Sequence, residues 1–287
     1  MTAIIWGAGG QDGFYLKELL FKEGFHVIGI SRSEGFINVD LDNYEAVSRF
    51  IKDSSPSYIF HLAANSTTRH AAWKENHDTI STGSINILEA VKEFAPACKV
   101  FLSGSGLQFI NAGKPIKETD PFEASSIYSV SRIHTVYAAR YYRTLGLKVY
   151  IGYFFHHDSP RRSERHINKK IIVTAKRIAD GSKEKLEIGD VAVQKEFGYA
   201  GDIVQGVWEL VKQDDIFEAV IGTGKAHAIE EWVNVCFSLF GLHWKDHTEK
   251  VEGFVPDFKM LVSDPSTIHS LGWRPKVNMD ELAKLML

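Results

Sequence analysis

The stretch Ala3-Ile4-Ile5-Trp6-Gly7-Ala8-Gly9-Gly10-Gln11-Asp12-Gly13 decides the fold of this chain. An apolar run ends at Trp6, and glycines then recur at the spacing GxxGxxG. Between a strand and a helix, the first glycine of this pattern permits a tight turn, the second lets the backbone approach a pyrophosphate, and the third allows close helix–strand packing. The stretch therefore predicts a dinucleotide site at a helix N-terminus. The cofactor contacts expected here are Gly7, Gly10, Gln11, Asp12 and Gly13.

Strands and helices alternate through the rest of the N-terminal half. Gly24 ends the first helix, and a short strand is expected just before Asp40. The other predicted strands cover 26–30, 58–62, 99–102 and 148–154, and the predicted helices cover 44–51, 83–94 and 127–145. Such alternation implies parallel strands joined by right-handed crossovers. The predicted fold is therefore α/β, with a doubly wound parallel sheet of the Rossmann type.

The pattern loosens after residue 155. A polar and basic segment leads to predicted helices over 171–180, 202–212 and 229–240, predicted strands over 186–188 and 217–221, and a last amphipathic helix near the C-terminus. We predict a dinucleotide-binding domain over 1–155, with returns near 190–225, and a smaller interleaved part over 156–287 that mainly binds substrate.

Composition excludes several classes of function. The 287 residues carry a net charge of −3, so no broad basic field for a nucleic acid is present. No apolar run approaches the roughly 18 residues of a membrane span. The N-terminus leaves no room for a signal peptide before the glycine motif, so we expect a cytoplasmic protein. The two cysteines and the scattered histidines lack the spacing of metal ligands, and no metal is expected.

The end of the second predicted strand favours NADP over NAD. The sequence there is Ser31-Arg32-Ser33. An NAD enzyme usually has an acidic residue at this point to hold the ribose 2′-hydroxyl, whereas an arginine accommodates a 2′-phosphate. The alternative is that Arg32 is a solvated surface residue. Further cofactor contacts are expected from Asp40 and Leu41 at the adenine edge and from Leu62, Ala63 and Ala64, which end a strand.

Together these motifs resemble those of the extended short-chain dehydrogenase/reductases, and specifically the GDP-mannose 4,6-dehydratase branch. Residues 11–16 (QDGFYL) are similar to the QDGxYL of that branch, residues 158–162 (DSPRR) to its ESPRR, and residues 195–202 (KEFGYAGD) to its RDWGxAxD. The pairs 170–171, 223–224 and 264–265 and the segment 271–273 continue the match, so the resemblance covers nearly the whole chain.

The resemblance implies a nucleotide-diphosphate sugar as substrate and a tightly held NADP. The substrate-binding residues it suggests are His156, Arg161, Arg162, Lys170 and Lys195. Arginines of this kind grip phosphates by bidentate, charge-assisted hydrogen bonds; the alternative is a solvated basic loop. The pattern departs from the family at His156, where relatives have asparagine, and at Val255, where relatives have an arginine for the diphosphate.

The catalytic pattern of the branch is incomplete. Family dehydratases carry Thr-x-Glu after the strand that ends here at Leu102, and Tyr-x-x-x-Lys on the next helix. This chain has Gly104 and Gly106 at the threonine and glutamate positions; it keeps Tyr128 but has Arg132 in place of the lysine. The elimination step of a dehydratase then has no evident general acid or base at position 106. The catalytic candidates are Tyr128, Arg132, Ser103 and Ser105, of which Tyr128 and Arg132 are also expected to contact the cofactor.

We therefore expect an NADP-dependent enzyme that transfers hydride at a ring carbon of a nucleotide-diphosphate sugar, with Tyr128 as acid/base. Reduction or epimerisation fits the residues better than dehydration. One alternative is a true 4,6-dehydratase whose catalytic groups have moved, with His156, His157 or Glu164 as replacements. Another alternative is a non-catalytic protein that binds a sugar nucleotide or a cofactor.

The expected assembly is a homodimer. The connection between residues 31 and 40 is much shorter than in the dehydratases, where this loop reaches the cofactor site of a neighbouring subunit and builds a tetramer. That route is not open to this chain. The two long helices predicted over 83–94 and 127–145 remain for a dimer contact.

Overall fold

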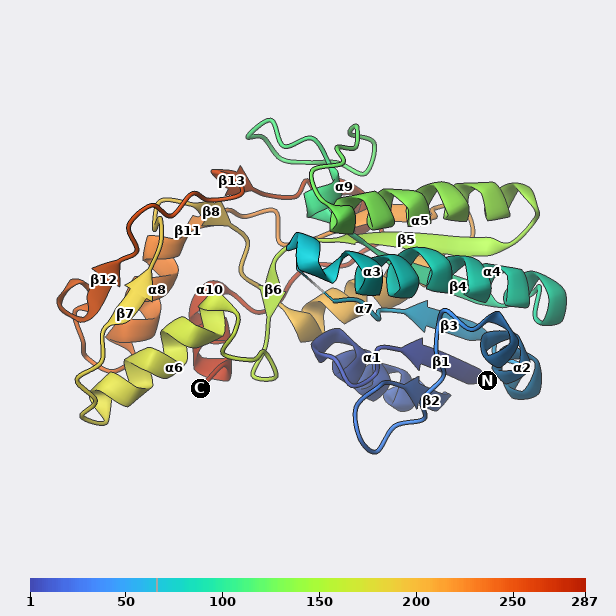
Figure 1. The fold of residues 1–287 in the computed structure, drawn as a ribbon, viewed down its shortest axis with the longest axis horizontal. Helices are drawn as coiled ribbons and strands as arrows, with labels where there is room; N and C mark the ends of the chain where they lie inside the picture. Colours follow the sequence, from blue (N-terminus) through green and yellow to red (C-terminus); the bar gives the residue numbers. More distant parts are fainter. Residues whose placement is uncertain (66) are drawn as a thin grey trace.

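Within the residues that the structure describes, 1–65 and 67–287, six parallel strands form one sheet in this computed structural model (Figure 1). Their spatial order is β10-β5-β4-β3-β1-β2, and every neighbouring pair is parallel. The strands are β1 (Thr2–Trp6), β2 (His26–Ile30), β3 (Tyr58–His61), β4 (Lys99–Ser105), β5 (Lys148–Phe154) and β10 (Glu218–Ile221). This arrangement confirms the predicted doubly wound α/β fold.

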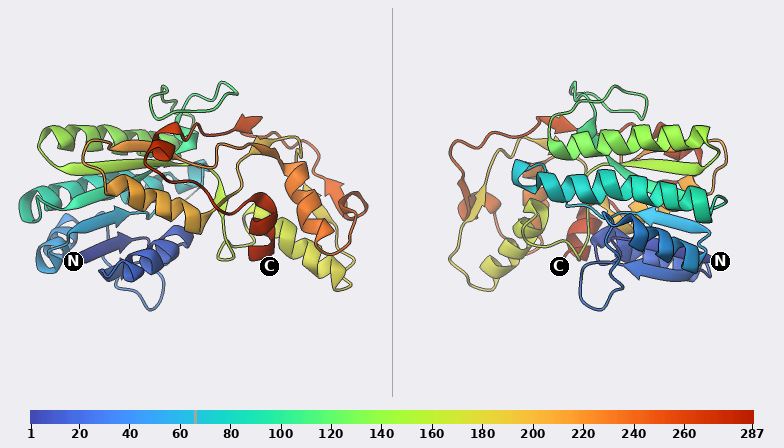
Figure 2. Two further views of the ribbon diagram at one scale, coloured as in Figure 1. Left: turned by 180° about the vertical axis from the view of Figure 1, so that it is seen from behind. Right: turned by 45° about the vertical axis from the view of Figure 1, so that its right-hand side comes forward.

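Helices cover both faces of the sheet. On one face lie α2 (Tyr44–Ser54), α4 (Gly83–Phe94) and α5 (Ile127–Thr144), and on the other lie α1 (Gln11–Lys22) and α7 (Ala200–Val211). Figure 1 shows α4 and α5 in front of the sheet, and the reversed view of Figure 2 brings α7 to the front.

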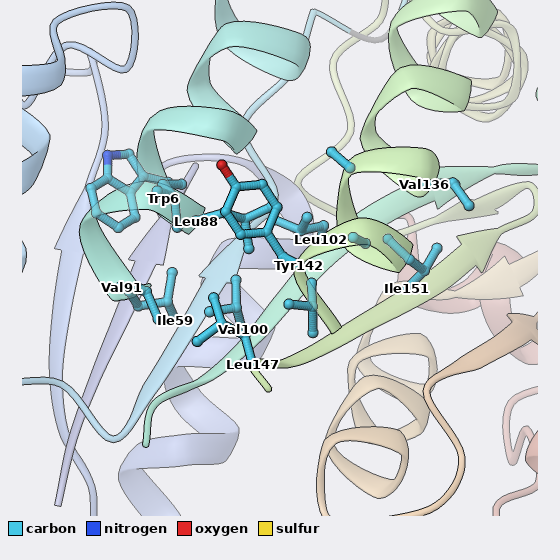
Figure 3. Close-up of a cluster of buried hydrophobic side chains, with 14 of the residues drawn as sticks. Trp6, Ile59, Leu88, Val91, Val100, Leu102, Val136, Tyr142, Leu147 and Ile151 are labelled. Atoms are coloured by element: carbon cyan, nitrogen blue, oxygen red, sulfur yellow. The ribbon is translucent and has the colours of Figure 1, made fainter. Parts of the chain in front are cut away.

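The strands are apolar on both faces because both are buried. Ile59, Val100 and Ile151 pack against α4 and α5, as the close-up in Figure 3 shows. Phe60 and Phe101, which follow Ile59 and Val100 in sequence, point the other way, to the cluster around α1 and α7. The alternation of side chains along each strand thus builds two cores on one sheet.

A smaller lobe lies at the carboxyl ends of the strands (Figures 1 and 2). Its core joins α6 (Ile167–Ala179), α8 (Ile229–Ser238) and α10 (Met279–Leu285). Three short ladders complete it: β7 (Leu186–Ile188) with β12 (Thr248–Lys250); β8 (Gln194–Lys195) with β11 (His227–Ala228) and β13 (Met260–Leu261); and β6 (His157–Asp158) with β9 (Gly198–Tyr199). The short helix α9 (Ser266–Ser270) returns to the sheet, where it packs on β10 and α7.

The structure corrects several predicted boundaries. The short strand expected before Asp40 is only a single bridge between Ile37 and Ile30. The strand predicted over 99–102 continues to Ser105, so Gly104 lies within it and Gly106 directly follows it. The helix predicted over 83–94 is preceded by α3 (Trp73–Asn76) and a π-helical turn over His77–Thr82. Among the described helices, none has both the length and the apolar character of a membrane span.

Candidate active site

One cavity of about 440 Å³ lies at the carboxyl ends of β1, β3, β4 and β5, where the sheet meets the smaller lobe. In open α/β sheets this edge is the usual place for a ligand, next to the point where the strand order reverses. The predicted site residues that line the cavity are Gly7, Gly10, Gln11, Asp12, Gly13, Leu62, Ala64, Ser103, Ser105, Tyr128, Arg132, His156, Arg162 and Lys195. Cofactor, catalytic and substrate candidates therefore meet in one place.

The glycine turn between β1 and α1 forms one wall. Gly7 has a φ of +91°, and a Cβ there would lie 2.7 Å from the backbone nitrogen of Ala63. A Cβ on Gly13 would collide with the carbonyl oxygen of Gly7. No side chain caps the N-terminus of α1 at Gly10. The first turn of α1 therefore keeps N–H donors for an anion, and the close turn fits the pyrophosphate of a nicotinamide dinucleotide.

Two side chains of α1 bind the segment that follows β5. The Asp12 carboxylate lies 2.9 Å from Nε2 of His157, whose Nδ1 lies 2.7 Å from the carbonyl oxygen of Phe155. Ser159 donates a hydrogen bond of 2.8 Å to Gln11. Burial opposes both charges, but the pairing prevails: it lowers the pKa of Asp12 to about 2 and raises the pKa of His157. The pair is therefore an ion pair in mildly acidic solution.

Tyr128 and Arg132 project into the cavity from the first two turns of α5. Ser126 caps the N-terminus of this helix by accepting a hydrogen bond from the N–H of Ser129. Arg132 is buried, with its guanidinium carbon 5.2 Å from the centre of the Tyr128 ring. Its Nη1 donates to the carbonyl oxygen of Ser103 and, at 2.8 Å, to the Ser103 hydroxyl. Its Nε has no hydrogen-bond partner among the described residues.

The Ser103 hydroxyl also donates to the carbonyl oxygen of His61, 3.1 Å away. The hydroxyl of Ser105 accepts a hydrogen bond of 3.2 Å from the N–H of Leu107 and so caps the turn after β4. Both predicted catalytic serines thus line the cavity, but each already serves a local structure.

Aromatic rings fill the space beside the two glycines at the end of β4. A Cβ on Gly104 would lie 2.6 Å from the Tyr153 ring, and a Cβ on Gly106 would lie 2.9 Å from the Phe155 ring. Tyr153 is anchored by a hydrogen bond of 2.6 Å from its hydroxyl to Glu218. The structure therefore leaves little space for a larger side chain at either position.

Of the described residues that line the cavity, two carry a carboxylate, Asp12 and Asp158. Asp158 accepts hydrogen bonds from Arg162 at 2.9 Å and from Asn168 at 2.6 Å. Burial raises the pKa of Asp158, but the nearby Arg162 and Lys195 outweigh it and lower this pKa overall. Both carboxylates are therefore ionised and engaged.

Two basic side chains, His156 and Lys195, also line the cavity. Burial lowers the pKa of His156 to about 3, and the nearby Lys195 adds to this effect, so the imidazole is neutral. Its Nδ1 has no partner among the residues described. Burial also lowers the pKa of Lys195 to about 8, with Asp158 opposing the shift and Arg162 reinforcing it. The cavity thus presents an ammonium and a guanidinium that suit a phosphate-bearing ligand.

Other predicted site residues lie outside the cavity lining. Arg161 stacks on the Phe14 ring at 4.1 Å, and Lys170 points to the carbonyl oxygen of Glu187 at 3.4 Å. Arg32, Asp40, Leu41 and Ala63 are also outside it. Leu41 is buried against α4, and Ala63 supports the turn at Gly7.

Sequence reasoning missed Asp158 and Asn168 as parts of the cavity. Asn168 is buried, and its Oδ1 has no partner within the described chain. Asp158 belongs to the DSPRR segment, and Asn168 lies two residues before the KI pair, so both were within reach of the motifs. Their pairing with each other depends on the fold of the smaller lobe.

Comparison with known proteins gives consistent matches. Residues 4–286 match the family model described as GDP-mannose 4,6 dehydratase. GDP-mannose 4,6 dehydratase 1 of Arabidopsis thaliana is 30% identical over 99% of this chain and 88% of its own length. The GDP-mannose 4,6 dehydratase of Homo sapiens is 26% identical over 100% of this chain and 90% of its own length.

Several solved structures of similar fold contain a nicotinamide cofactor. A Thermus thermophilus UDP-glucose 4-epimerase in complex with NAD superposes with a TM-score of 0.83 at 22% identity, covering 100% of this chain and 97% of that one. RMD from Pseudomonas aeruginosa, complexed with NADPH, superposes with a TM-score of 0.86 at 18% identity and the same coverage. At these identities the likeness concerns the fold.

Proposed function

The chain belongs to the GDP-mannose 4,6-dehydratase family, and from this premise we propose that it reduces or epimerises a nucleotide-diphosphate sugar by hydride transfer at a ring carbon, with NADP as cofactor. Membership makes it an NAD(P)-dependent nucleotide-sugar enzyme. The choice of reaction rests on the cavity itself. We also assign residues 156–287 mainly to substrate binding.

The observation that carries the choice of reaction is the Phe155 ring beside Gly106. The family pattern has a glutamate at position 106, where it serves the elimination. Here a Cβ would already meet the Phe155 ring at 2.9 Å. The position therefore lacks the carboxylate and also the space for one, which favours a reaction without elimination.

The replacement groups considered for a dehydratase are poorly suited to this role. His156 has a pKa of about 3 because it is buried, so it is a weak base and is not protonated at neutral pH. His157 is held between Asp12 and a backbone carbonyl. Glu164 pairs with Arg177, 2.9 Å away, and is not part of the cavity lining.

When bound, the cofactor would supply or accept the hydride. The glycine turn and the first turn of α1 would hold its pyrophosphate. The Tyr128 hydroxyl gives a proton to the carbonyl oxygen of the sugar as that carbon is reduced, or takes the proton back when the carbon is oxidised. Arg132 keeps a positive charge beside this ring, while Lys195 and Arg162 hold the diphosphate of the sugar nucleotide.

The preference for NADP rests on Arg32, which follows β2, next to the glycine turn. Solved structures of similar fold contain NAD in several cases and NADPH in another, so a nicotinamide cofactor is common to them. A guanidinium at this position favours a 2′-phosphate. Cys98 and Cys236 are buried and free, which suits a reducing compartment such as the cytoplasm.

A second candidate function is binding of a sugar nucleotide without turnover. It is favoured by Arg132, whose Nη1 is bound to both oxygens of Ser103. A lysine at this position would present a single mobile ammonium, whereas the planar guanidinium is held in place.

The experiment that tests the proposal is product analysis. Mass spectrometry first identifies any nucleotide that copurifies. The protein is then incubated with a panel of nucleotide-diphosphate sugars and their 4-keto forms, together with deuterium-labelled NADPH or with NADP. Deuterium in the sugar supports reduction, and an isomeric product supports epimerisation. A product lighter by one water, formed at an ordinary turnover rate, would contradict the proposal. Tight binding without any product would favour the second candidate.

A further inference from the structure

Arg32 is already paired in this structure. Its Nη2 lies 2.6 Å from Oε1 of Glu75, and Oε2 of the same carboxylate accepts a hydrogen bond of 2.7 Å from Asn65. The hydrogen bond from Arg32, followed by the hydrogen bond from Asn65, lowers the pKa of Glu75. Glu75 is therefore ionised at neutral pH, and each of its oxygens has a different partner.

The topology places this group across the dinucleotide site. β1 lies between β2 and β3 in the sheet. Arg32 follows β2, Asn65 follows β3, and the glycine turn follows β1. In Figure 1, β1 and β3 point toward the smaller lobe, and α3, which carries Glu75, lies at that end of the sheet. Glu75 binds Arg32 on one side of β1 and Asn65 on the other. These contacts therefore cross the carboxyl end of β1, beside the glycine turn.

We propose that Glu75 is a specificity-determining residue for the cofactor, because its carboxylate competes with the 2′-phosphate of NADP for the Arg32 guanidinium. This inference rests on the proposed function, which supplies the cofactor class. Glu75 thereby reduces the preference for NADP that Arg32 alone would give.

The two cofactors meet this pair differently. The 2′-phosphate carries negative charge, so it gains Arg32 only by displacing Glu75 or by lying next to another anion. The ribose 2′-hydroxyl of NAD is neutral and can donate a hydrogen bond to a carboxylate, as acidic residues do in NAD enzymes. The pair is solvent-exposed, with the side chain of Arg32 at 72% and that of Glu75 at 36% of full exposure. Such a pair is weak and exchanges readily.

The test is a set of binding measurements by calorimetry with NADP and NAD on the full chain. In Glu75→Gln the carboxylate is replaced by a neutral amide of the same shape. We expect the affinity for NADP to rise about three- to tenfold and the affinity for NAD to stay level or fall, since an exposed charge pair contributes up to about a factor of five and charge repulsion adds to it.

Two controls separate this effect from a general change of charge. Asp78→Asn removes the same charge from the following turn, but Asp78 pairs with Lys74 at 2.5 Å and does not contact Arg32. It should leave the NADP-to-NAD ratio unchanged. In an Arg32→Ala background, Glu75→Gln should no longer raise the affinity for NADP, because the residue for which the two anions compete is absent.

The outcomes distinguish the two claims. If the wild-type protein binds neither dinucleotide, the proposed function fails and this inference fails with it. If the wild type binds a cofactor but Glu75→Gln leaves the ratio of affinities unchanged, the inference is wrong and the proposed function stands. An equal rise in Asp78→Asn, or a full rise in the Arg32→Ala background, would likewise overturn the role of Glu75.

Discussion

Tyr128 is the side chain on which hydride transfer in this cavity depends most. It lines the cavity from the first turn of α5, and its hydroxyl can move a proton beside the buried cation of Arg132. We expect Tyr128→Phe to lower kcat by about a hundred- to ten-thousand-fold, the usual contribution of a positioned acid/base. Cofactor affinity should change little, because the hydroxyl acts mainly in the transition state. Stopped-flow kinetics and calorimetry on the same variant test both parts, and near wild-type turnover would contradict the assignment.

Lys195 gives the cavity a charge that titrates near neutral pH. It is protonated below its pKa of about 8, which burial has lowered from 10.5. Affinity for a nucleotide-diphosphate sugar should therefore fall as pH rises through this value. In Lys195→Gln, affinity at pH 7 should fall about ten- to a hundredfold, the range expected for a charge-assisted hydrogen bond. Calorimetry between pH 6.5 and pH 9 measures both effects.

Lys170→Gln is the matched control for Lys195, since it removes the same charge from the same lobe but lies outside the cavity lining. It should keep both the affinity and its pH dependence. If Lys195→Gln and Lys170→Gln behave alike, or if the Lys195→Gln variant keeps the wild-type loss of affinity above pH 8, Lys195 does not hold the substrate.

The ion pair between Asp12 and His157 joins α1 to β6, and thus the sheet to the start of the smaller lobe. The pKa of His157 is raised in the folded state, so its contribution to stability is full below the usual value of 6.5 and disappears as pH rises through the folded pKa. The pKa of Asp12 is lowered from 3.8 to about 2, so its contribution is full above 3.8 and disappears as pH falls toward 2. The pair therefore stabilises the fold most between these usual values.

His157→Gln should make this window visible in unfolding experiments. We expect the variant to be less stable than the wild type by about 1–3 kcal/mol at pH 5, because His157 is buried whereas Asp12 is only half-buried. The difference should shrink at alkaline pH, because the wild-type imidazole is then neutral as well. Denaturant unfolding of both proteins at pH 5 and pH 9 measures it. An equal difference at the two pH values would show that packing, and not charge, is responsible.

The residues that follow β4 and β5 are in contact at Gly106, the position at which this chain lacks the glutamate of the family pattern. Adding a Cβ at Gly106 forces the Phe155 ring to move, because the two would be 2.9 Å apart. We expect Gly106→Ala to cost about 1–3 kcal/mol of stability, as overpacking in a core does. Adding Phe155→Leu should restore part of this loss. Thermal and denaturant unfolding of the single and double variants test the contact; a fully stable Gly106→Ala protein would show that the ring has room to move.

Most helices, strands and the glycine turn could be predicted from the sequence, because residues that are close together in the chain determine them. The glycine spacing over 7–13 and the alternation of apolar runs indicated the sheet, which the structure confirms. The lengths of some elements could not be predicted in this way. Pairing with β5, for example, extends β4 to Ser105. Long-range partners were also hidden: His157 lies 145 residues from Asp12, and Arg32 lies 43 residues from Glu75. Such pairs form only because of the order of the strands in the sheet, and a local sequence pattern does not predict that order.

In the whole molecule, α4 and α5 run side by side on one face of the sheet (Figure 1). Along the outer side of α5, Val130, Tyr137 and Tyr141 are exposed, the two tyrosines each at 59%. Their spacing of seven and four residues keeps them on one side of the helix. Aromatic residues gathered on an outer face are typical of a protein–protein contact. A second copy of the chain, related by a two-fold axis, would cover them on both partners at once.

We therefore expect a homodimer through α4 and α5 at micromolar concentration, measured as a mass of two chains by light scattering. Tyr137→Asp together with Tyr141→Asp should give a folded monomer, because two buried charges without partners would oppose the contact. Phe21→Asp is the matched control: this side chain is 74% exposed, but it belongs to α1 on the opposite face of the sheet. It should remain dimeric. A stable tetramer in the wild type, or a dimer that survives the double substitution, would mean that the chain assembles through another surface.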